Sequence, residues 1–255
     1  MKLILTPLSN IPLIQMGDPL AKIILSSLLE NEIRLHDGDI IVITQKIVSK
    51  SEGRMVDLSS INPSPDAHKL ATRSEKKPQL VELILRESRS VLRVRPGTIV
   101  VEHRLGFICA NAGIDHSNVA GNGTETNEWV LLLPENPDYS ANMIRREMEE
   151  TTGARLGVLI IDSHGRPWRM GTVGVAIGLS GLPGLVDLRG KPDLYGYTLR
   201  ITQVGAADEL AAAASLIMGQ AAEGTPVVHV RGFPYPLQEG ELKEIIRPKD
   251  QDMFR

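Results

Sequence analysis

The chain has 255 residues, 42% hydrophobic and 23% charged, a composition typical of a globular protein that can bury a sizeable core. Its formal charge of -3 argues against an extended nucleic-acid surface, and its single cysteine, Cys109, excludes an internal disulfide or a cysteine metal cluster. No segment approaches the roughly 18 uncharged apolar residues of a membrane span, and the first residues lack a signal-peptide core, so we expect a cytoplasmic protein.

Hydrophobic periodicity predicts alternating types of element in an irregular order. In chain order we expect a helix over 18–31, a strand over 39–49, a helix over 78–92, a strand over 98–110, a helix over 138–153, strands over 155–162 and 197–205, a helix over 207–219 and a strand over 225–232. Gly153 and Gly219 are the expected C-caps of the last two helices. The irregular order favours a mixed α+β fold over a doubly wound sheet, with mostly antiparallel sheets, flanking helices and two intertwined lobes.

Two glycine-rich stretches need separate interpretation. Residues 121–128 are polar and predict a surface loop. The stretch from Gly171 to Gly184 fits no phosphate-binding fingerprint, so it is either a closely packed segment of small residues or a loop that faces a ligand. Walker-type, zinc-protease, nucleophile-elbow and dinucleotide-binding motifs are absent from the sequence.

An acid follows each of two apolar runs. Asp115 and Asp162 come at the expected strand ends, and each is followed by hydroxyl and imidazole side chains. One such aspartate is usually a turn-former or a helix cap. Two of them favour a site for Mg²⁺ or Mn²⁺, because these cations take carboxylate oxygens together with phosphate and water.

Other polar residues near these acids allow two interpretations. Arg166 and Arg169 either neutralise phosphate oxygens or form a solvated basic turn. Lys50, at the expected strand end, is either a phosphate ligand or a surface lysine. His116 and His164 are better interpreted as supporting or surface residues than as bases. Cys109 has no activating base beside it in sequence, so we expect a packed core residue.

The segments IPLI, KIVSKSEGR, NAGIDHSN, IIDSHGRPWRMGTVGVAIG, KPDLYGYTL and ADELAAAASLIMGQAAEGTPVVHVRG resemble, in order and spacing, the coenzyme F-420:gamma-glutamyl ligase family. The resemblance covers nearly the whole chain. It implies one catalytic domain over residues 1–255 without the flavin-binding extension of some relatives. It also implies a homodimeric α+β enzyme that adds L-glutamate to a deazaflavin precursor, F-420-0, using GTP and a divalent metal, with potassium as a further candidate cofactor.

The resemblance also implies roles for individual residues. Asp115, Asp162 and Lys50 would be catalytic, and Asp115, Asp162, Ser163 and Gln220 would hold metal. The nucleotide would be bound by Ile11, Pro12, Leu13, Ile14, Gln45, Lys46, Lys50, Asn118, Met218, Gly219, Gln220, Ala221, Ala222, Glu223, Gly224 and Thr225. Ser163 stands where some members have threonine, and Gln45-Lys46 replaces a small hydroxylic pair of some relatives.

In such a ligase the precursor carboxylate attacks the γ-phosphate of GTP, and glutamate opens the resulting acyl phosphate. Metal and lysine would neutralise the repulsion between the two anions. Two rivals remain: a metal-dependent GTP phosphohydrolase that uses the same acids, and a non-catalytic deazaflavin-binding protein.

Overall fold

The computed structural model describes residues 2–119 and 128–253, so the predicted loop over 121–128 lies, except for Glu128, outside the described residues. Its centre is a five-stranded sheet in the order β1 (Ile4–Pro7), β12 (Val227–Arg231), β2 (Ile40–Thr44), β8 (Gly157–Arg166) and β9 (Arg169–Ser180). The β2–β8 pair is parallel and the other neighbours are antiparallel. The expectation of a mixed, mostly antiparallel α+β fold is therefore confirmed.

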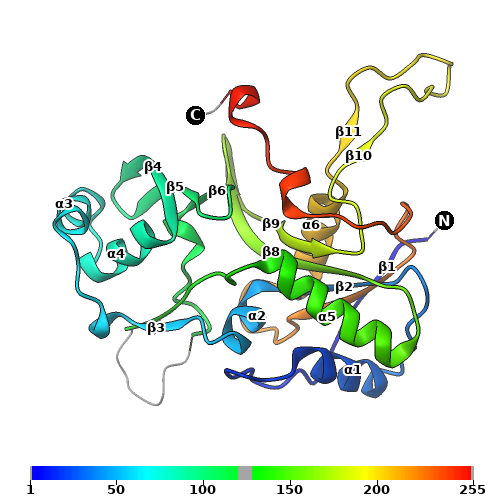
Figure 1. The fold of residues 1–255 in the computed structure, drawn as a ribbon, viewed down its shortest axis with the longest axis horizontal. Coiled ribbons are helices and arrows are strands. Elements are labelled where there is room, and N and C mark those ends of the chain that lie inside the picture. Colours follow the sequence, from blue (N-terminus) through cyan, green and yellow to red (C-terminus); the bar gives the residue numbers. More distant parts are fainter. Residues whose placement is uncertain (1, 120–127, 254–255) are drawn as a thin grey trace.

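Helices cover both faces of this sheet (Figure 1). Helices α1 (Leu20–Glu30) and α5 (Pro137–Thr152) share one hydrophobic core with Ile41 and Ile43 of β2. Helix α6 (Ala206–Met218) packs on the other face, against Ile40 and Val42. Alternate residues of a strand point to opposite faces of the sheet. Helices on both faces therefore explain why consecutive residues of β2 are buried.

A second lobe is formed by the chain between β2 and α5 and has its own hydrophobic core (Figure 1, left). It contains α3 (Pro65–Ser74), α4 (Pro78–Arg86), the pair β3 (Met55–Asp57) and β7 (Trp129–Leu131), the sheet β4 (Ser88–Arg95), β5 (Thr98–His103) and β6 (Ile108–Ala110), and the short 3-10 helices η1 (Leu58–Ser60) and η2 (Asn111–Gly113). This lobe carries Asp115 toward the end of β8.

The long periodic helices and the strand over 225–232 are confirmed. Gly153 ends α5 in the left-handed region at φ 72°, and Gly219 ends α6 at φ 75°. The strand over 39–49 is wrong beyond Thr44, where the seven-residue helix α2 (Gln45–Ser51) begins. The strand over 155–162 instead continues to Arg166, so Asp162 lies within β8.

Three further predictions were too simple. The helix over 78–92 ends at Arg86, and β4 follows it. The strand over 98–110 is a β5–β6 hairpin, and α3 was not predicted. Residues 197–205 contain only the two-residue strand β11 (Gln203–Val204), which pairs with β10 (Val186–Asp187).

Most of the glycine-rich stretch lies in the strand β9, where Gly174 and Gly178 allow close packing. A Cβ on Gly174 would lie 2.5 Å from the Ala211 carbonyl oxygen of α6, and one on Gly178 would lie 2.3 Å from Pro137 Cβ of α5. Only glycine lets both helices approach the strand this closely. Close packing therefore explains Gly174 and Gly178, whereas a Cβ on Gly171 would have no heavy atom within 4 Å.

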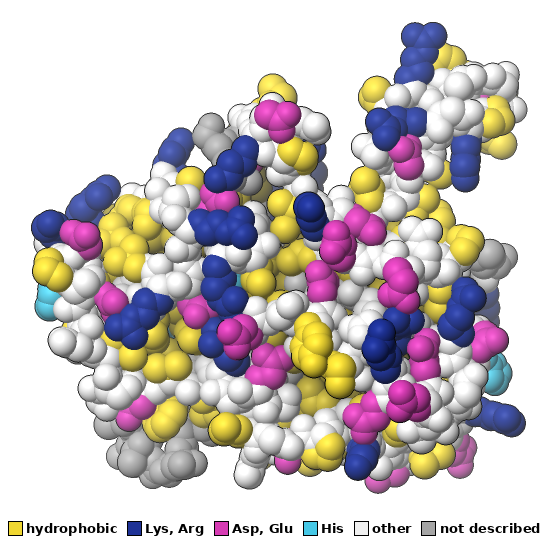
Figure 2. All heavy atoms as spheres, in the orientation of Figure 1, with side chains coloured by type: hydrophobic (Ala, Val, Ile, Leu, Met, Phe, Trp, Pro, Cys, Tyr) yellow, Lys and Arg dark blue, Asp and Glu magenta, His cyan; other side chains and the backbone are white. Residues whose placement is uncertain are grey.

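Residues between β10 and β11 form an arm that projects from the body (Figure 1). Its apolar side chains are open to solvent: Leu194 is 98%, Tyr195 96% and Ile201 87% exposed. Figure 2 shows basic and apolar side chains together on this arm. The C-terminal segment, with η3 (Leu242–Glu244) and η4 (Lys249–Gln251), returns across the body.

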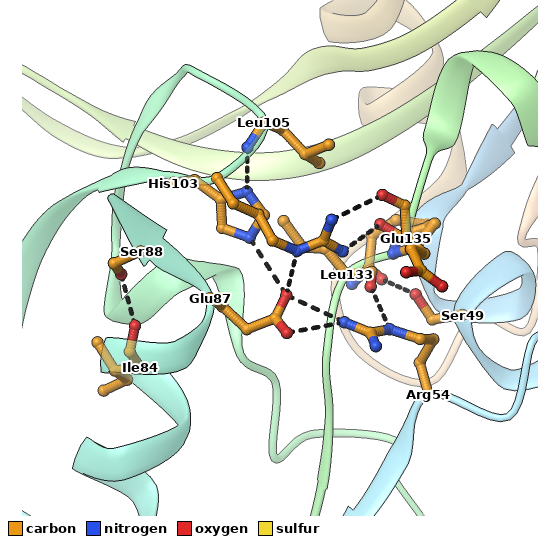
Figure 3. A network of polar contacts seen from close by, with 12 residues as sticks. Ser49, Arg54, Ile84, Glu87, Ser88, His103, Leu105, Leu133 and Glu135 are labelled. Carbon is orange, nitrogen blue, oxygen red and sulfur yellow. Dashed lines mark hydrogen bonds and ion pairs between the residues drawn. The ribbon is translucent and has the colours of Figure 1, made fainter. Parts of the chain in front are cut away.

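A buried ion network joins the second lobe to the rest of the chain (Figure 3). Both carboxylate oxygens of Glu87 accept from Arg54 at 3.0 Å, and one accepts from Arg104 Nε at 2.8 Å. The two arginines also donate to the carbonyls of Leu133 and Glu135. Burial on its own raises the pKa of Glu87, but the hydrogen bonds and charges of the arginines outweigh burial, and the net shift is downward.

We expect Glu87→Gln to lower the free energy of unfolding by about 2 kcal/mol near neutral pH, because two partly buried guanidinium groups lose their anion. A lowered folded-state pKa stabilises above the unfolded pKa of about 4.3, and the gain is lost as pH falls through the folded value. Denaturant unfolding at neutral and acid pH should therefore show a difference that shrinks in acid. Glu150→Gln, at an exposed position, is the matched control.

Candidate functional site

The parallel register of β2 and β8 creates the site. Thr44, the last residue of β2, lies opposite Ile161 of β8. Beyond this pair the chain of β2 turns into α2, while β8 continues with Asp162, paired only to Val175 of β9. The first turn of α2 therefore lies beside Asp162 at the end of the shared ladder.

The second lobe brings Asp115 to the same place. After β6 the chain turns through Asn111, Ala112 and Gly113, all with positive φ, and the Asn111 side chain accepts from the Ile99 amide at 3.0 Å. The main chain of Asp115 then exchanges two hydrogen bonds with Leu131, at 3.0 and 2.9 Å. Asp115 is thus five residues past the end of β6. Its main chain is fixed by the preceding turn and by the two hydrogen bonds to Leu131.

The first two residues of α2 hold the Asp115 carboxylate. Gln45 Nε2 donates to Asp115 Oδ2 at 2.7 Å, and Lys46 Nζ lies 3.2 Å from the same oxygen. Burial raises the pKa of Asp115, the charge of Lys46 opposes this, and the negative charge of Asp162 adds to the rise. The negative charge of Asp162 therefore acts on Asp115, whose carboxylate is held by the start of α2.

The other predicted metal ligands form a second pair. Ser163 Oγ donates to Gln220 Oε1 at 2.9 Å, and Gln220 Nε2 donates to Ser215 Oγ at 2.9 Å. Asp162 and Ser163 are neighbours in a strand, so their side chains leave opposite faces. Asp162 instead contacts His164, with 3.0 Å between its Oδ2 and the imidazole Nε2.

The loop after α6 meets α2 through Asn118. Lys50 Nζ donates to the Asn118 carbonyl at 2.8 Å, and Asn118 Nδ2 donates to the Ala221 carbonyl at 3.2 Å. Glu223 accepts from the Ala221 amide at 2.7 Å, and Thr225 Oγ1 donates to a main-chain oxygen of the helix end. Lys50 belongs to α2, which corrects its expected position at a strand end. Burial lowers the pKa of Lys50, and the positive charge of Lys46 lowers it further.

The segment Ile11–Ile14 connects to these residues indirectly. Ile14 is buried in the α1 core, whereas Leu13 is 90% exposed. The Gly17 amide, three residues on, donates to the Ser51 carbonyl at the end of α2. The turn after the predicted segment therefore contacts the last residue of α2, whereas Asp115 is held by the first two residues of that helix.

The remaining polar candidates are placed as follows. Arg166 and Arg169 flank the β8–β9 turn opposite one another, and the Arg166 side chain donates to the Met170 carbonyl at 3.5 Å. His116 is exposed. Sequence reasoning missed Phe107, whose ring centroid is 5.3 Å from that of His164, and Ser215, which binds Gln220. Phe107 lies in an apolar run and Ser215 lies within helix α6, so the sequence around each gives no sign of a functional site.

The ligand chemistry of the site suits a hard cation. Within residues 2–119 and 128–253, no group of three His, Cys, Asp or Glu side chains is arranged to hold a metal. The predicted set offers two carboxylates, one hydroxyl and one amide oxygen, with no sulfur. Because Asp162 and Ser163 leave opposite faces of β8, these oxygens belong to two separate pairs, and each pair has the ligand type that Mg²⁺ or Mn²⁺ takes together with phosphate and water.

Comparison with known proteins shows the family of the chain. A model of the family described as F420-0:Gamma-glutamyl ligase matches residues 9–232. The chain belongs to that family. It is 50% identical over 248 residues to the coenzyme F420:L-glutamate ligase of Methanothermobacter thermautotrophicus, with 96% of each chain covered.

Other relatives carry the same name. The Methanopyrus kandleri protein is 47% identical over 243 residues, covering 94% of this chain and 92% of the relative. The Archaeoglobus fulgidus protein is 42% identical over 250 residues, covering 98% and 95%. The chain is therefore an enzyme of the ligase class. Among its described residues, no helix is both long and apolar enough to cross a membrane.

Cys109 lies beside this site but is a core residue, 6% exposed. Burial raises the pKa of its thiol to about 12, and the charge of Asp162 adds to the rise. The thiol is therefore protonated and shielded at neutral pH.

We expect a disulfide reagent such as Ellman's reagent to leave the native protein unlabelled and to titrate one thiol after unfolding in guanidinium chloride. Rapid labelling of native protein would contradict this assignment.

Proposed function

We propose that this ligase adds L-glutamate to the deazaflavin precursor F420-0 and uses GTP, with release of GDP and phosphate. The observation that carries the proposal is the Asp115 carboxylate, held by Gln45 and Lys46 of α2, the helix that also carries Lys50, in a chain that is similar along its length to coenzyme F420:L-glutamate ligases.

In the proposed reaction, a carboxylate oxygen of the precursor forms a bond to the γ-phosphorus of GTP, and the bond to GDP breaks. The glutamate amine then attacks the acyl carbon of the acyl phosphate, phosphate leaves, and the amine loses its proton to give the amide. Carboxylate and triphosphate are both anions. Lys46 and Lys50 lie where their charges can reduce this repulsion, and Asn118 joins Lys50 to the loop after α6.

Mg²⁺ or Mn²⁺, when bound, supplies the charge stabilisation that phosphoryl transfer needs. Asp115 with Asp162, and Ser163 with Gln220, are the two groups of oxygens proposed to hold it. Their separation into two pairs supports two cation positions, and potassium remains a further candidate. The nucleotide is proposed to lie along Gln45, Lys46, Lys50 and residues 218–225, and Ile11–Ile14 extends this surface.

The direct test is mass spectrometry of purified chain incubated with F420-0, L-glutamate, GTP and Mg²⁺ or Mn²⁺. The expected product is the precursor with one or more glutamates, formed only when GTP and metal are both present. GTP consumed without dependence on glutamate would instead identify a phosphohydrolase. Absence of GTP turnover with retained precursor binding would identify a non-catalytic deazaflavin-binding protein.

The acid pair gives a sharper test. Asp115→Asn and Asp162→Asn nearly preserve volume but delete a negative ligand charge. Each change should abolish most ligase activity, and the double change should add little, because groups that act as a unit are non-additive. The ligase rates and melting temperatures of the two single variants and the double variant decide between a shared and an independent role. Near-normal glutamate transfer by a folded single variant would refute the metal role, and independent, multiplying losses would refute a shared role.

Lys50 is proposed to contact nucleotide phosphate from α2. Lys50→Met keeps most of the stem but removes the charge, so GTP affinity should fall about tenfold, the loss of one charged hydrogen bond. The melting temperature should change little, because the burial that lowers the pKa of Lys50 disfavours the charge in the folded protein. Lys69→Met, on exposed α3, is the control. GTP affinity equal to that of the control would return Lys50 to the role of a surface lysine.

A homodimer is part of the proposal, supported by the arm over 188–202 with its exposed Leu194, Tyr195 and Ile201. Apolar groups in such numbers are usually covered in an assembly. Sedimentation velocity should give a dimer for the full chain and a monomer for Leu194→Asp combined with Tyr195→Asp. A dimer that survives both changes would show that the arm is not its contact.

A further inference from the structure

Gln45, the first residue of α2, is enclosed by the protein, with 0% of its surface exposed. Both ends of its side-chain amide have partners. Nε2 donates to Asp115 Oδ2 at 2.7 Å, and Oε1 accepts from Ser49 Oγ at 3.0 Å. Ser49 lies one turn further along α2 and is also 0% exposed. The resemblance to a family implies that Gln45 binds nucleotide, but a side chain enclosed in this way presents no surface to a nucleotide.

The two contacts determine which way the Gln45 amide points. A carboxylate only accepts hydrogen bonds, so the amide nitrogen must face Asp115. The amide oxygen then faces Ser49, whose hydroxyl donates to it. Without that hydroxyl the amide would be free to turn over, which would place its oxygen against the carboxylate. Ser49 therefore selects the orientation in which Gln45 is a donor to Asp115.

These contacts leave one oxygen of Asp115 for a ligand. Gln45 and Lys46 both approach Oδ2, and no hydrogen bond from a described residue reaches Oδ1. The Asp115 side chain is 28% exposed, so a cation can reach it from solvent. A carboxylate can bind a cation through one oxygen while the other accepts a hydrogen bond, and such hydrogen bonds orient carboxylates for metal binding.

Gln45 and Lys46 differ in their response to a cation at Asp115. Lys46 carries a positive charge that the cation repels, and its side chain, 24% exposed, has room to turn toward solvent. Gln45 is neutral and enclosed, so it keeps its hydrogen bond to Oδ2 when the cation is present. Of the two residues, Gln45 is therefore the one that can orient Asp115 both before and after a cation binds.

We propose that Gln45 is a positioning residue that holds Asp115 ready for a divalent cation in the free protein, and that Ser49 acts through Gln45 by orienting its amide. The nucleotide is then bound by Lys46, Lys50 and the loop after α6, and the Gln45 side chain does not contact it. This assignment rests on the proposed function for the metal role of Asp115. It gives Gln45 a different role from the one that the resemblance implies.

Matched variants separate this role from a purely structural one. Gln45→Met keeps the length and most of the volume of the side chain but removes the amide, so the carboxylate loses its donor. Ser49→Ala removes only the hydroxyl. Gln238→Met makes the first change at an exposed position. Ser74→Ala makes the second at a serine of α3 that is also 0% exposed and donates to a main-chain oxygen of its own helix.

The probe is Mn²⁺ alone, titrated without nucleotide and followed by the electron paramagnetic resonance signal of the free ion. Gln45→Met should weaken Mn²⁺ binding at least about tenfold, the loss typical for residues that orient metal ligands. Ser49→Ala should weaken it less, and should have no further effect when combined with Gln45→Met, because Ser49 acts only through Gln45. Gln238→Met and Ser74→Ala should bind Mn²⁺ as the parent chain does.

A second titration measures GDP affinity with metal removed by EDTA. Gln45→Met should bind GDP as the parent chain does, whereas Lys50→Met should bind it more weakly. Loss of GDP affinity in Gln45→Met with unchanged Mn²⁺ affinity would make Gln45 a nucleotide contact and reject the positioning role. Absence of Mn²⁺ binding by the parent chain would also reject it, because the role is assigned to the free protein.

Asp115→Asn distinguishes failure of this assignment from failure of the proposed function. If Asp115→Asn binds Mn²⁺ as tightly as the parent chain, the metal role of Asp115 is wrong and the assignment fails with it. If Asp115→Asn binds Mn²⁺ weakly but folded Gln45→Met binds it normally, only the positioning role is wrong. Melting temperatures establish folding. If Gln45→Met does not fold, equal Mn²⁺ affinity of Ser49→Ala and Ser74→Ala would overturn the assignment.

Discussion

The site depends on one constraint, the parallel ladder between β2 and β8. Parallel neighbours run in the same direction, so the end of β2 and the continuing strand β8 meet at one edge, and Thr44 opposite Ile161 fixes which residues meet there. A shift by one residue would turn Asp162 to the α6 side and Ser163 to the Asp115 side. The buried side chains on both faces, Ile41 and Ile43 toward α1 and Ile40 and Val42 toward α6, prevent such a shift.

The glycines of β9, the edge strand beside β8, determine how closely two helices pack on the same sheet. Helices α5 and α6 pack against Gly178 and Gly174 through Pro137 and Ala211, so both helices approach the sheet closely. The chain after α6 then brings Gln220 to Ser163 and Ala221 to Asn118. A larger residue in β9 would move α6 outward, and the loop that carries Gln220 would move with it. The small-residue segment thus acts on the site through packing.

The sequence predicted those parts of the fold whose signals are local. Helices α1, α5 and α6 were found because apolar residues recur with helical spacing and glycine follows the last two. Helix α2 was missed because its residues continue the apolar run of β2. It forms where the ladder with β8 ends and where Ile47 and Val48 can reach the α1 core. Residues 197–205 were predicted as one strand because their apolar residues suggest burial, whereas Tyr197 and Ile201 are exposed on the arm.

The sequence drew attention to Asp115 and Asp162 but not to the residues that surround them. Each aspartate follows an apolar run, yet nothing local shows that Gln45 and Lys46 bind Asp115, because that contact joins segments far apart in sequence. The resemblance to a family supplied the residue types, and the geometry was determined by non-local register.

Lys46 offsets the unfavourable charge coupling of the two acids. Burial and the negative charge of Asp162 both raise the pKa of Asp115, so an ionised Asp115 needs a nearby cation. Lys46 provides one at 3.2 Å, but both side chains of this pair remain about a quarter exposed, at 24% and 28%. Pairs with that much solvent contact contribute only about 0 to 1 kcal/mol. A ligand that brings its own positive charge to Asp115 can therefore release Lys46 toward an anion at little cost to the fold. In the proposed function, Asp115 would then face the cation and Lys46 the phosphate.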